Sequence, residues 1–241
     1  MKTLAIELRK EKRTGIVAVL PIVGVAGAAY AFANFMVRID SLLSLPMAPM
    51  DVLLTQLYGV IMMLNLFGIL VAACMMYHME FSGTAIKKMY LLPVSIPKMY
   101  LCKFLILTVT LLTAVVLQNL ALVKIGMTDL PRGTFSMSSL VAFAGYSFVT
   151  SMPVLSFMLL VSSRFDSMWI PLGVGVAGFL TGMALGTSGI ALFLADPFVI
   201  LLMPAVSMSA RPDAVIVLIA VLETLLFLGV GMRMSQKVRD E

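Results

Sequence analysis

Long apolar runs alternate with short polar segments along most of this chain. The runs cover residues 16–37, 52–77, 104–123, 135–161, 168–189 and 214–232. An α-helix rises about 1.5 Å per residue, so about 20 apolar residues cross a hydrocarbon layer of about 30 Å. Each run comes close to that length or exceeds it. The pattern therefore predicts an all-α membrane protein with six transmembrane helices.

Residues 1–15 have a shorter, amphipathic pattern. Leu4, Ala5 and Leu8 fall on one helical face. The basic residues around that face are Lys2, Arg9, Lys10, Lys12 and Arg13. Because this pattern is typical of a helix that lies along a membrane surface, we expect an interfacial helix before the first span. A solvated basic flank that only sets orientation is the alternative.

The segment between the fifth and sixth runs holds two apolar stretches that are too short to cross a bilayer. They cover residues 190–195 and 198–206, and Asp196 and Pro197 stand between them as an N-cap and a first helical residue. Irregular backbone at membrane depth must be covered by protein or lie at the interface. We therefore predict two short outer helices packed on the other helices, with a plain extracellular loop as the alternative.

The polar connection 78–103 separates the second run from the third. Its start and stop signals predict a helix over 81–91 along the membrane, with Ser82 as the cap and Pro93 and Pro97 as two stops. Its lysines are Lys87, Lys88, Lys98 and Lys103. This predicts a structured connection that a soluble protein is able to contact.

Composition and charge support a polytopic membrane protein. Of the 241 residues 61% are hydrophobic and 12% are charged, and the mean hydropathy of +1.07 is too high for one water-soluble core. Of the 17 lysines and arginines, those that fall on the poorer side of the membrane are Arg38, Lys124, Arg132 and Arg211. The positive-inside rule therefore predicts that both termini and residues 78–103 are cytoplasmic. Since the basic residues lie between apolar runs, the net charge of +5 does not indicate nucleic-acid binding.

The sequence offers no catalytic or metal-binding constellation. His78 is the one histidine, so Gly186-Thr187-Ser188-Gly189 lacks a base for a serine protease mechanism. Cys74 and Cys102 both fall at cytoplasmic ends of spans, where a disulfide is not expected. A Gly-Lys pair is absent from the sequence, so there is no P-loop, and any ATP must be bound by another chain.

Small residues mark one packing face within the fifth run. Gly178, Gly182 and Gly186 are spaced by four, which places them on one side of a helix and allows another helix to approach closely. That helix belongs either to this chain or to a second subunit, and spacing alone does not decide between them.

Glu223 is the one acid near the middle of an apolar run. An ionisable side chain there costs about 2.5 kcal/mol or more, so we expect it to face protein or water and to have a partner. The candidate hydrogen-bonding partners inside other spans are Asn65, Gln118 and Asn119. A substrate or gating role and a structural role at a subunit seam both remain open.

The layout and one motif together resemble the ABC-2 type permeases. The motif residues are Glu80, Gly83, Thr84, Lys87, Pro93, Val94, Ser95 and Lys103. The nearest resemblance is to the permease subunits of lantibiotic-immunity and bacitracin-export transporters. It covers the whole chain in layout and residues 80–103 in motif.

The resemblance implies a half-transporter that pairs with a second permease, identical or related, above two ATP-binding subunits. Residues 80–91 match the coupling helix that contacts the ATPase, with ATP and Mg held in that partner and no cofactor bound by this chain. The implied ATPase-coupling residues are Glu80, Gly83, Thr84, Lys87, Lys88, Tyr90 and Pro93. The alternative is that these side chains only anchor the connection to lipid headgroups.

The implied activity is export of an antimicrobial peptide of the lantibiotic type, or of another amphipathic compound, from the bacterial plasma membrane. Two other classes fit the composition. A secondary transporter needs no ATPase, but we detect no convincing internal repeat. A membrane assembly subunit without transport activity is the remaining alternative.

Overall fold

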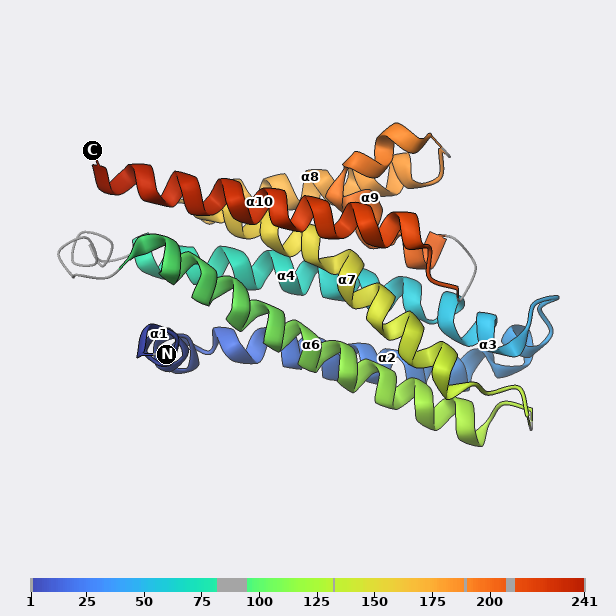
Figure 1. The fold of residues 1–241 in the computed structure, drawn as a ribbon. Coiled ribbons are helices and arrows are strands. Elements are labelled where there is room, and N and C mark those ends of the chain that lie inside the picture. Colours follow the sequence, from blue (N-terminus) through green and yellow to red (C-terminus); the bar gives the residue numbers. More distant parts are fainter. Residues whose placement is uncertain (1, 82–94, 132, 189, 207–210, 241) are drawn as a thin grey trace.

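A computed structural model describes residues 2–81, 95–131, 133–188, 190–206 and 211–240. These residues form helices joined by short connections, without a strand among them (Figure 1). The helices are α1 (Lys2–Thr14), α2 (Ile16–Leu43), α3 (Pro49–Asp51), the π-helix η1 (Val52–Gln56), α4 (Tyr58–Phe81), α6 (Ile96–Thr128), α7 (Met137–Ser162), α8 (Trp169–Gly186), the 3-10 helix η3 (Ala191–Ala195), α9 (Pro197–Val206) and α10 (Ala214–Asp240).

Within the described residues, six helical segments are long and apolar enough to cross a membrane. They are α2, the continuous segment Pro49–Phe81, α6, α7, α8 and α10. The all-α class and the six predicted spans are therefore confirmed. The chain is a multi-pass membrane protein.

The long helices lie side by side in one bundle, and α1 crosses one end of it (Figure 1). Helix α2 packs on α6 and α4, while α7 packs on α4, α6, α9 and α10. The chain turns from α1 into α2 at Gly15, whose φ of 79° lies in the left-handed region that glycine adopts without a steric penalty. This turn allows α1 to run across the bundle end.

Helices α4 and α6 extend further than the sequence predicted, so the connection between them is shorter. Helix α4 ends at Phe81 and α6 begins at Ile96. Pro97 stands in the first turn of α6 after the N-cap Ser95, so its predicted role as a stop is wrong. A proline at that position loses no intrahelical hydrogen bond and has a suitable φ. Most of the predicted helix 81–91 lies outside the described residues.

The segment between α8 and α10 contains two short helices, as predicted. Asp196 Oδ1 accepts a hydrogen bond of 2.9 Å from the backbone N–H of Phe198, and Pro197 is the first residue of α9. Residues 197–202 are buried, and α9 packs on α7, α8 and α4. These short helices are therefore part of the bundle; their position at the outer face stays a prediction.

The helix that approaches the glycine face of α8 is α9 of the same chain. A Cβ atom added at Gly178 would lie 2.3 Å from the Phe198 ring, and one at Gly182 would lie 3.0 Å from the Phe198 carbonyl carbon. At Gly186 an added Cβ would meet nothing within 4 Å. Two of the three predicted packing glycines thus serve internal packing.

Candidate functional site

Five charged side chains meet at the end of the bundle that α1 crosses. We call Glu7, Lys10, Glu11, Glu80 and Lys103 the ionic cluster. The Lys103 ammonium is its centre: it donates to Glu7 Oε2 at 3.1 Å and to Glu11 Oε1 at 3.4 Å, and it lies 2.9 Å from Glu80 Oε1. Lys10 forms a second ion pair with Glu80. All members except Lys10 are at most 2% exposed.

Three helices contribute to the ionic cluster. Glu7 and Glu11 are four residues apart on α1, so both point to the same face, and that face packs on the bundle. Glu80 lies in the last turn of α4, and Lys103 lies two turns into α6. The cluster therefore joins α1 to the two helix ends that flank residues 82–94.

Aromatic side chains cover the ionic cluster. The Tyr77 ring centroid lies 5.4 Å from Lys103 Nζ, within the range of a cation–π contact. Tyr100, one turn before Lys103, is 1% exposed, and a Cβ atom added at Gly231 of α10 would lie 2.3 Å from its hydroxyl. This close approach brings α10 against the same end of the bundle. Because four of its five members are buried, the charge interactions in the ionic cluster are stronger than they would be in water.

The ionic cluster contains three carboxyl groups and only two ammonium groups. Lys103 contacts all three acids, so its charge offsets part of the cost of burying them. Burial raises the pKa of the Glu11 carboxyl above its usual range, although Lys103 and Lys10 act in the opposite direction. A raised pKa means that the docking of α1 makes the charged form of Glu11 less favourable than it is for an exposed carboxyl.

The raised pKa of Glu11 predicts that Glu11→Gln is tolerated and strengthens the docking of α1 at neutral pH. An acid with a raised folded-state pKa costs stability above that pKa, and this cost disappears as the pH falls toward the usual value of the group. We expect the advantage of Gln over Glu to shrink as the pH falls toward 4.5. Limited proteolysis of α1 against pH measures it; an advantage of Glu over Gln at neutral pH would contradict the burial argument.

The structure changes the interpretation of Glu80. The sequence placed Glu80 among the side chains that contact a soluble partner, but its carboxylate is turned inward onto Lys103 and Lys10. In this structure Glu80 is therefore a buried member of the ionic cluster, and its contact with a soluble partner stays a prediction. The other predicted coupling residues lie outside the described residues: Gly83, Thr84, Lys87, Lys88, Tyr90 and Pro93.

The sequence pattern did not identify Glu7 and Glu11 of α1 as members of a site. The apolar edge of α1 faces away from the bundle, with Leu4 39% exposed and Leu8 46% exposed, whereas Glu7 and Glu11 are buried; its contact with the membrane interface stays a prediction. The available signal was the spacing of two acids by four residues inside a basic segment. Opposite a helix end that carries a lysine, such a pair predicts an ion-paired face.

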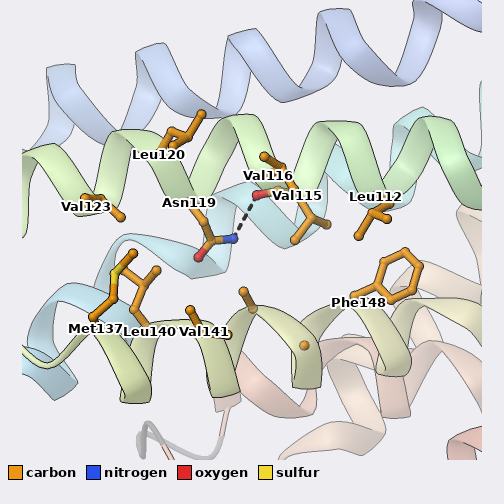
Figure 2. Close-up of a pocket in the computed structure, with 12 residues that line it drawn as sticks. Leu112, Val115, Val116, Asn119, Leu120, Val123, Met137, Leu140, Val141 and Phe148 are labelled. Carbon is orange, nitrogen blue, oxygen red and sulfur yellow. Dashed lines mark hydrogen bonds between the residues drawn. The ribbon is translucent and has the colours of Figure 1, made fainter.

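The polar residues inside the spans do not meet as predicted. Asn65 and Gln118 pair with each other: Asn65 Nδ2 donates to Gln118 Oε1 at 3.1 Å, and Gln118 Nε2 donates to Asn65 Oδ1 at 2.7 Å. Asn119 Nδ2 donates to the carbonyl of Val115 at 2.8 Å. Glu223 is half-buried, and its buried Oε2 has no hydrogen-bond partner among the described residues. None of the three amides therefore bonds to Glu223 Oε2: Asn65 and Gln118 pair with each other across α4 and α6, and Asn119 donates within its own helix (Figure 2).

Comparisons with known proteins give one family. A family model described as ABC-2 family transporter protein matches residues 3–182, which includes α1, the ionic cluster and the first four spans. The comparison with curated proteins and the comparison with solved structures each gave no significant match.

Proposed function

Because the chain belongs to the ABC-2 family of transporter proteins, we propose that it is the permease subunit of an ATP-binding-cassette exporter whose ATP is hydrolysed by a separate subunit. The family assignment makes it a membrane component of a transporter. The ATP-binding partner and its Mg²⁺ are proposed from the family and from the lack of a P-loop in the sequence.

The ionic cluster is the observation that carries the proposed coupling mechanism. An ATPase changes a membrane conformation only through contacts that differ between its states. In our proposal residues 82–94 receive that contact. The ion pairs of Lys103 tie the two flanking helix ends to α1, so a displacement of either end also moves α1. Glu80 then acts as a positioning residue within the permease.

The proposed assembly contains a second permease, identical or related, and both termini of this chain lie in the cytoplasm. Positive charge concentrated at the ionic-cluster end supports this orientation. The proposed cargo is an antimicrobial peptide or another amphipathic compound of the bacterial plasma membrane. Secondary transport remains the alternative, and the lack of an internal repeat argues against it.

Copurification with an ATP-binding protein tests the proposal. We expect the intact chain, purified in mild detergent, to bring down an ATPase whose activity responds to cargo. Lys87→Ala combined with Lys88→Ala should reduce copurification, by about a kcal/mol or two of binding energy if the contacts are partly buried. Lys98→Ala, an exposed lysine on α6, is the matched control.

One result would overturn the proposal, and a second would change which side chains carry the coupling. Cargo movement by the purified chain alone, driven by an ion gradient, would assign it to secondary transport. Wild-type copurification and export in the Lys87/Lys88 variant would remove the coupling role from these two side chains.

A further inference from the structure

Three basic side chains of α1 open onto a pocket at the end of the bundle that α1 crosses. Among the described residues it is lined by Arg9, Lys10, Arg13 and Thr14, and its volume is about 410 Å³. We call it the basic pocket. Small-molecule sites have volumes of about 300–1,000 Å³, so the basic pocket has room for a ligand. Arg9 and Arg13 are four residues apart on α1, so their side chains lie on one face and reach the same ligand.

The two arginines have no counter-charge within the described part of the chain. Both are exposed, and neither takes part in the ion pairs of the neighbouring ionic cluster. Like charges at this spacing repel each other. An anion that accepts hydrogen bonds from both guanidinium groups removes the repulsion and gains charge-assisted hydrogen bonds. Thr14 Oγ1 donates to the carbonyl of Glu11 at 2.9 Å, so Thr14 is a wall of the pocket rather than a donor to the anion.

Lys10 connects the basic pocket to the ionic cluster. Its ammonium pairs with Glu80 and lies 3.9 Å from Glu7, and its side chain is 34% exposed where it lines the pocket. The cluster has one more carboxyl group than ammonium groups, and Arg9 and Arg13 turn this into a balance of one positive charge. A phosphodiester carries one negative charge. A single phosphodiester therefore neutralises this group of side chains.

The basic pocket lies at the level at which the first span begins. Thr14 is two residues before Ile16, where the apolar span formed by α2 starts, and α1 crosses the bundle end beside this start (Figure 1). The hydrocarbon core of a bilayer is about 30 Å thick, and headgroups extend the whole to about 40–45 Å. The start of a span therefore meets the headgroup layer, where a phospholipid presents its phosphate.

Exposed apolar side chains accompany the basic pocket. Ile6 is 64% exposed and lies one turn before Lys10 on α1. On α2, Ile22 is 65% exposed and Val25 is 59% exposed. A phospholipid places hydrocarbon directly beside its phosphate and so covers both kinds of surface. A free phosphate ion or an acidic protein surface leaves Ile6 in water, so the surroundings of the pocket favour a lipid.

We propose that the basic pocket binds the phosphate of an anionic phospholipid, with Arg9 and Arg13 as its hydrogen-bond donors and Lys10 as a further positive charge. The acyl chains of that lipid then lie along the first turns of α2. The bound lipid adds a membrane contact to the ion pairs that hold α1 on the bundle. The proposal goes beyond the export function and does not depend on it.

Quenching by a spin-labelled lipid measures occupancy of the pocket. The full chain, with Cys74→Ala and Cys102→Ala, carries a bimane fluorophore at Ile6→Cys and is placed in phosphatidylcholine nanodiscs. Phosphatidylglycerol with a nitroxide near the top of one acyl chain should quench this fluorophore with about three- to tenfold higher apparent affinity than phosphatidylcholine with the same label. The same fluorophore at Val37→Cys, which is 84% exposed near the other end of α2, should not distinguish the two lipids.

Two charge-matched variants separate a site from a general attraction of anionic lipid to a basic surface. Arg9→Gln combined with Arg13→Gln should abolish the preference for phosphatidylglycerol at Ile6. Lys12→Gln combined with Lys98→Gln removes the same charge from exposed residues that do not line the pocket, and it should keep most of the preference. An equal loss in both double variants would overturn the site, because lipid selection would then follow net charge alone.

Two salts distinguish lipid from free phosphate. Sodium phosphate and sodium chloride at equal ionic strength should weaken the quenching equally, because both act by screening. Release of the lipid by phosphate at a concentration where chloride has no effect would assign the pocket to a soluble phosphate and reject the proposal.

A protein occupant gives a third pattern. Unchanged lipid quenching in the Arg9/Arg13 variant, together with lost copurification of an ATP-binding protein, would assign the two arginines to that protein and also reject the proposal. The lipid measurements need no ATPase. Failure of the lipid site therefore leaves the copurification test of export intact, and failure of that test does not alter the lipid result.

Discussion

Lys103→Met is expected to release α1 from the bundle without removing the protein from the membrane. The substitution keeps the length and apolar stem of the side chain but leaves Glu7, Glu11 and Glu80 facing one another, with only Lys10 as a counter-charge. Breaking a buried ion pair by removing one partner costs about 3–5 kcal/mol. Because the apolar spans that drive insertion are unchanged, the loss should fall on the docking of α1.

Tryptic cleavage after Arg9 and Arg13 measures this release. If α1 must undock before it is cut, the cleavage rate should rise about 100-fold or more, and the proposed ATP-driven export should fall with it. Lys98→Met, an exposed lysine earlier on α6, is the matched control and should behave as wild type. Adding Glu80→Gln to Lys103→Met should recover part of the protection, because one uncompensated charge is removed. Unchanged cleavage in Lys103→Met would show that Lys103 does not hold α1.

The spans and the two short helices between α8 and α10 could be predicted because their signals are local. Apolar length gives a transmembrane helix, and Asp196-Pro197 gives a helix start without reference to any other part of the chain. The ends of α4 and α6 could not be predicted in the same way. Lys103 looks like a flanking charge at the membrane surface, and only the approach of Glu7 and Glu11 from a distant segment allows the helix to bury it.

Which polar side chains hydrogen-bond to each other also could not be predicted from the sequence. Composition identified Asn65, Gln118, Asn119 and Glu223 as polar positions in spans, but it contained nothing about which helix faces meet. The reciprocal pair of Asn65 and Gln118 depends on the register of α4 against α6, which is set by packing along both helices. Close helix approach could likewise be predicted only where glycines repeat. Regular spacing identified Gly178 and Gly182, whereas Gly24 has no second glycine four residues away and was not identified.

Gly24→Val is expected to separate α2 from α6, the two helices that pack together most extensively in the described chain. A Cβ atom added at Gly24 would lie 2.7 Å from Ala114 Cα and 3.0 Å from the Ala114 carbonyl oxygen. Both atoms are backbone, so no side-chain rotation relieves the clash and one helix must move. Overpacking usually costs about 1–3 kcal/mol, and backbone contact places this case at or above the upper end.

The displacement should also reach the amide pair in the bundle. Gly27, one turn further along α2, faces Gln118, and a Cβ atom added there would lie 2.8 Å from Gln118 Nε2. Moving α2 therefore disturbs the side chain that pairs with Asn65. Thermal unfolding in detergent should show a large loss for Gly24→Val, a smaller loss for Gly24→Ala and almost none for Gly173→Val, which adds the same side chain in open space on α8. Equal melting of Gly24→Val and Gly173→Val would mean that α2 and α6 do not approach this closely at Gly24, and the register that pairs Asn65 with Gln118 would then need another cause.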